Sequence, residues 1–296
     1  MPRINGAQII IRYLEKRGIR TISGIPGGAN LPLYDALATS SRIRHVLARH
    51  EQGAGFIAQG MARTTGEVGV CFATSGPGAT NILTAIADAY LDSVPIVCIT
   101  GQVPSTLLGT DAFQEVDTYG MSMPITKHNY LVRSAKDLLT ILPRAFELAG
   151  TGRPGPVLID VPKDVQTEVI EFESWPEEVH AEENMEEHAE AIATAAAMIN
   201  RAERPILYLG GGVIHAGAAA EARQLAEQGN IPTVMTLMGL GIMPTDHPLS
   251  LGMLGMHASR ATNLAMAECD LLIAAGVRFD DRATGLISSF CPEAKV

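Results

Sequence analysis

Short apolar runs alternate with helical segments along most of the chain. In the first helical segment, Gly6–Lys16, the apolar residues Ile10 and Leu14 share one face. Gly18 follows as a typical C-terminal stop. Further strands are predicted near Thr21 and at Ile43–Ala48, Val68–Ala73, Ile96–Thr100 and Val157–Val161, and further helices at Glu51–Arg63, Gly78–Leu91 and Leu138–Ala149. Apolar strands that alternate with helices predict a parallel sheet covered on both faces.

The second half of the chain repeats this alternation. Its predicted helices are Ala189–Arg201, Ala218–Glu227 and Ala261–Ala267, and its predicted strands are Pro205–Leu209, Pro232–Thr236 and Leu271–Ala275. The final residues 294–296 read like the opening of another strand, so we expect the chain to be the N-terminal portion of a longer protein. The predicted fold class is α/β, with two successive doubly wound parallel-sheet domains.

Charge separates the two halves. The net charge is −10, and ten glutamates with no Lys or Arg lie between Glu168 and Glu190, which leaves 22 acidic against 22 basic residues elsewhere. We therefore expect an acidic, mostly solvated linker at residues 168–190, between a first domain at residues 1–167 and a second at residues 191–296. No basic stripe indicates a nucleic-acid partner.

Other features narrow the class of protein. No apolar run reaches the roughly 20 residues of a membrane span, and no signal peptide is recognisable, so we expect a cytoplasmic protein without a membrane partner. Cys71 and Cys98 lie inside apolar strands and are expected to be core thiols. No C-x-x-C pair occurs, and no metal ligands are predicted in this chain.

Glu51 stands where a predicted helix begins, beside small and apolar residues. A carboxyl group next to Ala54 and Phe56 would be partly desolvated, which favours its neutral form and lets it exchange a proton with a weakly basic nitrogen. Alternatively, Glu51 places a negative charge in the first turn of its helix, where the helix dipole favours it. The residues alone leave both interpretations open.

Several strand-to-helix turns are rich in glycine or polar residues. The segment ATSGPGATN at residues 73–81 suits either an anion at a helix N-terminus or a tight turn, and it lacks the known phosphate-loop spacings. The glycines of GIPGGAN at residues 24–30 suit either close approach of a ligand or turn geometry. The loop GTDAFQEVD at residues 109–117 follows a strand, where parallel sheets bind ligands.

Taken in order, ten segments resemble one family, the catalytic (large) subunit of acetolactate (acetohydroxyacid) synthase, a thiamin-diphosphate-dependent enzyme. The segments are GIPGGA, RHEQGA, ATSGPGATN, ITGQV, GTDAFQE, ITKHNYLV, GRPGPVLIDVPKD, LGGGV, LGMLGMH and GVRFDDR. They extend over nearly the whole chain and are most similar to the isozyme I type. The resemblance implies a pyrimidine-binding domain followed by an FAD-binding central domain.

The resemblance also implies a role for Glu51. In this family the glutamate of RHEQGA hydrogen-bonds N1′ of the aminopyrimidine ring of thiamin diphosphate and promotes the tautomer that removes the C2 proton of the thiazolium ring. Pyruvate then loses CO₂, and the remaining two-carbon unit adds to a second pyruvate or to 2-oxobutyrate. The products are 2-acetolactate and 2-aceto-2-hydroxybutyrate, used in branched-chain amino-acid biosynthesis.

Other roles carry over by position. The resemblance places Gly27, Gly28 and Ala29 at the reactive end of thiamin diphosphate, with Gly28 acting through its backbone. It places Phe113 and Gln114 at the active site across a dimer interface and Lys163 near the substrate entrance. The residues implied to contact FAD are Arg153, Gly211, Gly212, His257 and Arg278. The resemblance further implies at least a homodimer and a small regulatory subunit.

The sequence departs from the family pattern in three ways. Ala258 and Val277 stand where the family commonly has glycine and alanine. The GDG…N motif that holds Mg²⁺ and the diphosphate belongs to a third domain that this chain lacks, so we expect the chain alone to be inactive. The alternatives are another thiamin-diphosphate enzyme, similar to pyruvate oxidase, and a non-catalytic FAD-binding module.

Overall fold

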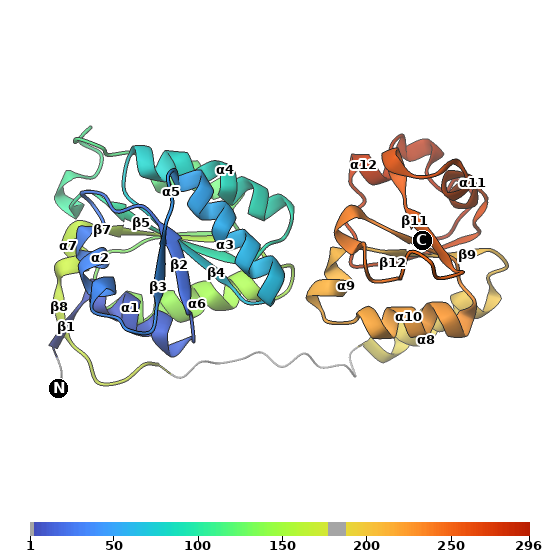
Figure 1. The fold of residues 1–296 in the computed structure, drawn as a ribbon, viewed down its shortest axis with the longest axis horizontal. Coiled ribbons are helices and arrows are strands. Elements are labelled where there is room, and N and C mark those ends of the chain that lie inside the picture. The colour runs from blue at the N-terminus through green and yellow to red at the C-terminus, as the bar shows by residue number, and fades with distance from the viewer. Residues whose placement is uncertain (1–2, 177–187) are drawn as a thin grey trace. The chain divides into compact units, whose positions relative to one another are not determined.

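The computed structural model describes residues 3–176 and 188–296 (Figure 1). The chain divides into two compact units, Met1–His180 and Ala181–Val296, called unit 1 and unit 2 below. Both are built on parallel sheets with helices on the faces, which confirms the predicted α/β class. Among the described residues, no helix is long and apolar enough to cross a bilayer.

Unit 1 contains a six-stranded parallel sheet in the order β3-β2-β4-β5-β7-β6. Its strands are β2 (Thr21–Gly24), β3 (Arg44–Leu47), β4 (Gly69–Ala73), β5 (Ile96–Gln102), β6 (His128–Leu131) and β7 (Val157–Pro162). Its helices are α1 (Gly6–Lys16), α2 (Leu31–Ala38), α3 (Glu51–Thr65), α4 (Pro77–Leu91), α5 (Thr118–Ser122), α6 (Leu138–Gly150) and α7 (Lys163–Thr167).

Two separate cores explain why strands and helices alternate in the sequence. One face of the sheet packs on α1, α2 and α6, and the other on α3 and α4 (Figure 1). The central strands β4, β5 and β7 are buried throughout, so their sequences are apolar without a two-residue period. Cys71 and Cys98 pair across β4 and β5 and are fully buried, as predicted for core thiols.

The segment predicted as a solvated linker is partly ordered in unit 1. Strand β8 (Val169–Glu171) pairs antiparallel with β1 (Arg3–Asn5), and the Trp175 ring lies 5.1 Å from the ring of Tyr13. The prediction of a linker from residue 168 is therefore corrected for residues 169–175. Apolar Ile170, Phe172 and Trp175 lie among the glutamates and supply the packing surface that the acidic composition concealed. Residues 177–187 lie outside the described residues.

Unit 2 contains a four-stranded parallel sheet in the order β11-β10-β9-β12. Its strands are β9 (Pro205–Leu209), β10 (Thr233–Met235), β11 (Ser250–Met253) and β12 (Leu271–Ala275), and its helices are α8 (Ala189–Arg201), α9 (Gly211–His215), α10 (Ala219–Gly229), α11 (Arg260–Glu268) and α12 (Asp281–Thr284). Lys295 forms a parallel bridge to Leu271, in agreement with the strand opening predicted at residues 294–296.

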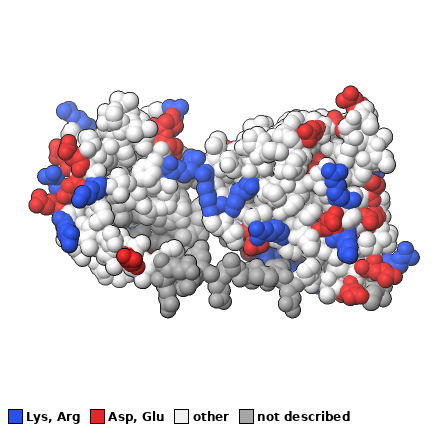
Figure 2. Space-filling view, turned by 180° about the vertical axis from the view of Figure 1, so that it is seen from behind, with Lys and Arg blue, Asp and Glu red and all other residues white. Residues whose placement is uncertain are grey.

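Charged side chains are mixed on the surface. On the face of unit 1 drawn in Figure 2, Lys and Arg are interspersed with Asp and Glu and form no stripe of one sign.

Helices α3 and α4 cross at Gly55. A Cβ built on Gly55 would lie 2.4 Å from the Cβ of Ala85, whereas a Cβ on Gly60 of the same helix would have no atom within 4 Å. Gly55 therefore sets the distance between α3 and α4, and Gly60 does not.

We predict that Gly55→Ala destabilises unit 1 by about 1–3 kcal/mol through overpacking, although alanine favours the helix intrinsically. Gly60→Ala is the matched control and should stabilise the unit by up to about 1 kcal/mol. The measurement is denaturant unfolding followed by fluorescence of Trp175, the single tryptophan. Equal stability of the two variants would contradict the packing argument.

Asp160 is a buried carboxyl group on β7, with 1% of its surface exposed. Its Oδ1 accepts a hydrogen bond from the Thr100 hydroxyl (2.7 Å) and its Oδ2 one from Nε2 of Gln102 (2.9 Å). Burial raises the pKa of Asp160 to about 7, the two hydrogen bonds act in the opposite direction, and the charge of nearby Asp117 raises it further.

We expect this shift to make the stability of unit 1 depend on pH. Because the folded-state pKa lies above the unfolded value of about 4, the contribution of Asp160 is fully present below pH 4, is lost as pH rises toward 7, and is constant above that. The slope approaches about 1.4 kcal/mol per pH unit. In Asp160→Asn this contribution disappears, so the stability difference between variant and parent should shift in favour of the variant between pH 5 and 7. A difference that stays constant would contradict the raised pKa.

Candidate functional site

The carboxyl ends of β3, β2 and β4 lie side by side, because these strands are parallel neighbours. The loops that follow them carry Glu51, the segment Gly27–Ala29 and the segment Thr74–Gly78. Three of the segments singled out in the sequence therefore meet at one edge of the sheet, where open α/β folds bind ligands.

Thr74 joins two of these loops. Its hydroxyl oxygen accepts a hydrogen bond from the amide of Ala29 (3.3 Å), and a Cβ on Gly27 would lie 2.6 Å from its side chain. The buried side chain of Asn30 closes the same turn by accepting from the amide of Gly27 (2.7 Å). Gly27 is thus required by close packing, whereas Gly28 is exposed, with no atom within 4 Å of a Cβ.

Glu51 is the first residue of α3, and its side chain points to α4. The N-cap of α3 is His50, whose Nδ1 accepts from the amide of Gln52 (3.2 Å). Glu51 stands in the first turn of α3, where the helix dipole favours its charge, and its Oε2 accepts a hydrogen bond from Nδ2 of Asn81 (2.9 Å).

The second oxygen of Glu51 lies close to Gly78, near the start of α4. A Cβ on Gly78 would lie 3.4 Å from Oε1 and 2.7 Å from Cγ2 of Thr74. Within the described part of the chain, Oε1 accepts no hydrogen bond. Glu51 is half-buried. The arrangement presents one oriented carboxylate oxygen to a ligand while Asn81 occupies the other.

Tyr34 and His45 lie on the other side of β2 from α3. The Tyr34 hydroxyl is 3.4 Å from Nε2 of His45. Burial, followed by the nearby Cys71 and the Glu51 charge, raises the pKa of Tyr34, and burial lowers the pKa of His45. Both side chains are therefore neutral at pH 7, and neither supplies a cation to pair with Glu51.

The loop after β5 brings Gln114 to the same edge. A Cβ on Gly76 would lie 2.7 Å from the backbone oxygen of Gln114, so this loop packs on the turn before α4. Phe113, beside it, is 87% exposed. The carboxylate of Glu115 accepts hydrogen bonds from the amides of Gly109, Thr110 and Ala112, and these bonds lower its pKa.

Lys163 opens α7, directly after β7, and is half-buried. The same helix carries Gln166, whose Nε2 donates to the carbonyl of Ala29 (2.8 Å). Lys163 therefore stands on a helix tied to the glycine turn after β2, at the edge that carries Glu51.

Arg153 lies before β7, at the amino ends of the strands and thus on the opposite side of the sheet from Glu51. Its guanidinium donates to the Ser93 hydroxyl (2.7 Å) and to the carbonyls of Tyr90 and Leu91 (3.4 Å each). In unit 1 it thus binds the C-terminal carbonyls of α4, and it is not brought together with Glu51.

In unit 2, glycines bring the ends of β9 and β12 into backbone contact. The amide of Gly212 donates to the carbonyl of Gly276 (3.0 Å), and a Cβ on Gly210 would lie 2.3 Å from that carbonyl oxygen. A Cβ on Gly211 would lie 3.0 Å from the Cβ of Met238, after β10. The Gly210–Gly212 turn is therefore fixed against two neighbouring loops.

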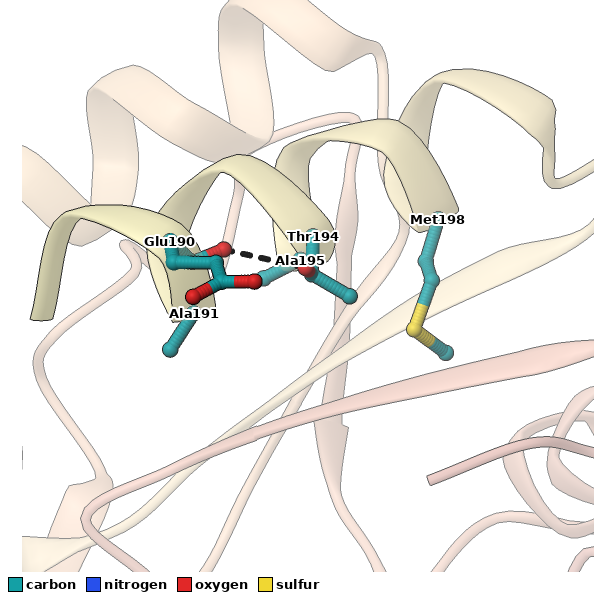
Figure 3. A pocket seen from close by; sticks show the side chains of 5 residues that line it. All are labelled: Glu190, Ala191, Thr194, Ala195 and Met198. Atoms are coloured by element: carbon teal, nitrogen blue, oxygen red, sulfur yellow. Dashed lines mark hydrogen bonds between the residues drawn. The ribbon is translucent and has the colours of Figure 1, made fainter.

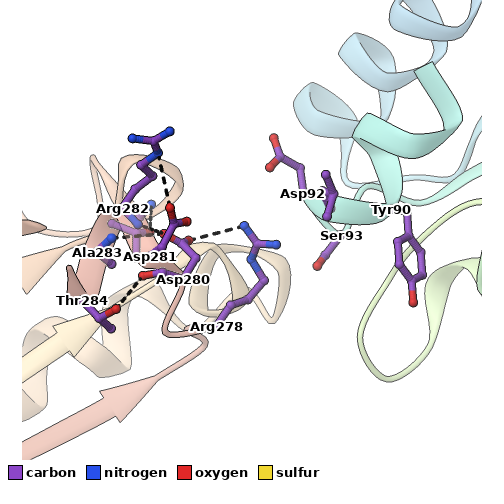
Figure 4. A network of polar contacts seen from close by, with 12 residues as sticks. Tyr90, Asp92, Ser93, Arg278, Asp280, Asp281, Arg282, Ala283 and Thr284 are labelled. Atoms are coloured by element: carbon purple, nitrogen blue, oxygen red, sulfur yellow. Dashed lines mark hydrogen bonds and ion pairs between the residues drawn. The ribbon is translucent and has the colours of Figure 1, made fainter. Parts of the chain in front are cut away.

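His257 and Arg278 follow the two edge strands of this sheet, and both are exposed. The turn that carries His257 reaches α12, because a Cβ on Gly255 would lie 2.2 Å from the carbonyl oxygen of Arg282. Arg278 pairs with Asp280 (3.4 Å), whose carboxylate caps α12 (Figure 4). The structure thus brings Gly211, Gly212, His257 and Arg278 to the carboxyl edge of one sheet.

A buried hydroxyl lies under this edge. The hydroxyl of Tyr208, on β9, has no hydrogen-bond partner among the described residues, and burial raises its pKa to about 12. The centroids of the Phe279 and Tyr208 rings lie 5.7 Å apart, and the angle between the ring planes is 78°, an edge-to-face arrangement. An unpaired buried polar atom is uncommon and marks a place where a ligand or water can bind.

Sequence reasoning missed three residues of the unit 1 site: Asn81, Thr74 and Asn30. Asn81 stands three residues after Gly78, which puts both on one face of α4, but that spacing indicates a contact only once the partner carboxylate is known. Thr74 and Asn30 hold turns through hydrogen bonds between distant segments, and no local pattern encodes such bonds.

Other features of the described residues offer little chemistry. No group of three or more His, Cys, Asp or Glu side chains within residues 3–176 and 188–296 is placed to hold a metal. A hollow along α8 is lined by Glu190, Ala191, Thr194, Ala195 and Met198, and the hydrogen bond within it joins the Thr194 hydroxyl to the carbonyl of Glu190 (Figure 3). All five residues come from one helix, so this hollow lacks convergent polar groups.

Each of the two units matches a known family of protein domains. Residues 4–121 match the family described as "Thiamine pyrophosphate enzyme, N-terminal TPP binding domain", and residues 192–296 match "Thiamine pyrophosphate enzyme, central domain".

Three relatives illustrate the similarity. The chain is 61% identical over 294 residues to the acetolactate synthase isozyme 1 large subunit of Escherichia coli, which covers 99% of this chain and 52% of that protein. It is 54% identical over 297 residues to the acetolactate synthase large subunit of Corynebacterium glutamicum (99% and 47%) and 51% identical over 300 residues to the probable large subunit of Methanocaldococcus jannaschii (99% and 50%). The chain spans about half the length of these curated relatives. The chain thus carries the N-terminal and central domains of the thiamine pyrophosphate enzymes and is similar over its whole length to acetolactate synthase large subunits.

Proposed function

We propose that the chain forms the part of an acetolactate synthase catalytic subunit that binds the aminopyrimidine end of thiamin diphosphate and FAD. The reaction is decarboxylation of pyruvate and transfer of the two-carbon unit to pyruvate or 2-oxobutyrate, in branched-chain amino-acid biosynthesis. The observation that carries the proposal is the half-buried carboxylate of Glu51, whose Oε2 is held by Asn81 and whose Oε1 has no hydrogen-bond partner among the described residues.

The residues around Glu51 fit the aminopyrimidine ring. Asn81 fixes the carboxylate by binding Oε2, which leaves Oε1 to hold and return one proton at a ring nitrogen. Thiamin diphosphate, when bound, supplies the carbon nucleophile for the 2-oxo acid. Gly27, Gly28 and Ala29 line the same edge, and exposed Gly28 lets the cofactor approach the backbone.

The substrate would enter at the same edge of unit 1. Lys163 offers a cation for the carboxylate of a 2-oxo acid, and Gln114 stands beside the turn before α4. The exposed Phe113 ring suits an interface with a second copy of the chain, so we propose a dimer in which this loop contributes to the site. The name "large subunit" of the relatives supports a small regulatory partner.

Unit 2 fits FAD as a bound group without a net redox role. Gly211 presents a backbone amide after β9, next to Gly212, whose own amide is bound to Gly276 and fixes the turn. His257 and Arg278 present donors from the loops after the two edge strands. The orphaned hydroxyl of Tyr208 lies under the same edge. The contact of Arg153 with FAD stays a prediction from the family resemblance. We place Mg²⁺ and the diphosphate on a domain outside this chain, and we propose a cytoplasmic enzyme.

We predict that Glu51→Gln slows exchange of the C2 proton of thiamin diphosphate by about 10²–10⁴-fold in a form of the protein that turns over, because an amide cannot share the proton in the same way. The measurement is proton–deuterium exchange followed by NMR. Glu67→Gln, at an exposed position after α3, is the matched control and should exchange at the parent rate. Exchange at an undiminished rate in Glu51→Gln would refute the role.

We predict that Arg278→Ala weakens FAD binding about tenfold, the loss of one charge-assisted hydrogen bond. Its ion pair with Asp280 is exposed, so folding of unit 2 should hardly change. The measurement is a titration of flavin fluorescence, with Arg201→Ala at the end of α8 as the control. Equal FAD affinity for parent, variant and control would contradict the placement of FAD.

A further inference from the structure

The proposed function leaves one buried carboxyl group, Asp160, without a role. Its two oxygens are occupied by the hydroxyl of Thr100 on β5 and the amide of Gln102 at the end of β5. A fully buried carboxyl group is costly to keep, and hydrophobic residues would stabilise a central strand better. Its presence indicates a task that an apolar side chain cannot perform.

Gln102 connects Asp160 to the loop after β5. Its Nε2 donates both to Oδ2 of Asp160 (2.9 Å) and to the carbonyl of Val116 (3.0 Å), and its Oε1 accepts from the amide of Val103 (2.8 Å). Gln102 is 2% exposed. With all of these bonds made, the amide is fixed in one orientation, and its Nε2 side faces Asp160 and Val116.

Beyond Val116, the loop is closed on itself and rests on α4. The carboxylate of Glu115 binds three amides of the loop, and the backbone of Gln114 packs on Gly76. Gln114 adopts a positive φ of 57°, which is uncommon for a residue other than glycine and requires support from its surroundings. The bond from Gln102 to Val116 supplies a fixed point two residues away.

We propose that Asp160 is a positioning residue that holds, through Gln102, the loop 109–117 and thereby places Phe113 and Gln114 at the active site. The effect of the loop on the reaction rests on the proposed function, whereas the attachment of the loop to Asp160 through Gln102 does not depend on it. A Gln102 without Asp160 would be free to rotate its amide, and the Val116 carbonyl would keep only its local bonds from Thr118 (2.8 Å from the amide). The loop would then lose its bond to β5 and keep its contact at Gly76, its internal bonds to Glu115 and the bonds of residues 116 and 117 to the start of α5.

Two substitutions at Asp160 separate positioning from mere folding. Asn has the size of Asp, and its Oδ1 can accept from Gln102 while its Nδ2 donates to the oxygen of Thr100. Ala removes both acceptors and leaves Gln102 without its partner. Asp160→Asn should therefore retain the hold on the loop, and Asp160→Ala should lose it.

The test is hydrogen–deuterium exchange of the full chain, resolved by residue. We expect the amides of Gly109, Thr110, Ala112 and Glu115 to exchange at least about tenfold faster in Asp160→Ala, with parent rates in Asp160→Asn. Asn129→Ala is the matched control. Asn129 is another buried polar residue of the same sheet, but it donates to Tyr119 and Ser122 of α5, so its loss should speed exchange there and not in residues 109–115.

Unchanged loop exchange in Asp160→Ala, or equal acceleration in Asp160→Asn, would overturn the proposal. In a form that makes acetolactate, Asp160→Ala should also lower kcat/KM at least about tenfold and Asp160→Asn should restore it, because a displaced loop misplaces substrate contacts. Equal kcat/KM in both variants would overturn the positioning role. The exchange experiment needs no cofactor, so a failure of the proposed function would not mimic a failure of this inference.

Discussion

Parallel pairing of β3, β2 and β4 is the constraint on which the proposed site depends. Neighbouring parallel strands have their carboxyl ends on the same side of the sheet. The loops after three strands therefore bring residues 27, 51, 74 and 78 together, although these loops are distant from one another in the sequence. Side chains then refine this convergence. Thr74 fixes the turn after β2, and Asn81 turns the carboxylate of Glu51 so that one oxygen remains open. The sheet sets the place of the site, and a few hydrogen bonds set its geometry.

Glycine has two different tasks at these edges. Gly27, Gly210 and Gly212 have no side chain because backbone or side-chain atoms occupy the space where a Cβ would lie. Gly78 belongs with them, because a Cβ there would lie 2.7 Å from Cγ2 of Thr74. Gly28 is different, because no atom lies within 4 Å of its Cβ position, and this open turn leaves room for a ligand. A sequence does not distinguish the two kinds of glycine.

The alternating pattern predicted most of the fold because it reflects burial of whole strands on both faces. The helix Gly6–Lys16 has the predicted bounds, and the strand predicted at Ile43–Ala48 is Arg44–Leu47. The pattern missed β6 (His128–Leu131), a polar edge strand, and the short ribbon of β1 with β8, which is too brief to show a period. Of the site, the residues around Glu51 left its role open, and only the family resemblance singled it out. Asn81 and the bonds of Asp160 were not predictable, because they join segments 30 and about 60 residues apart.

The most direct test of the central claim is a crystal structure of the protein, in a form that binds the cofactor, with thiamin diphosphate and Mg²⁺. The account predicts that Oε1 of Glu51 lies about 2.7–3.2 Å from a ring nitrogen of the aminopyrimidine, with Oε2 still bound to Asn81. The ring should occupy the space beside Gly78. An aminopyrimidine ring bound away from Glu51, or a carboxylate turned to another partner, would contradict the account.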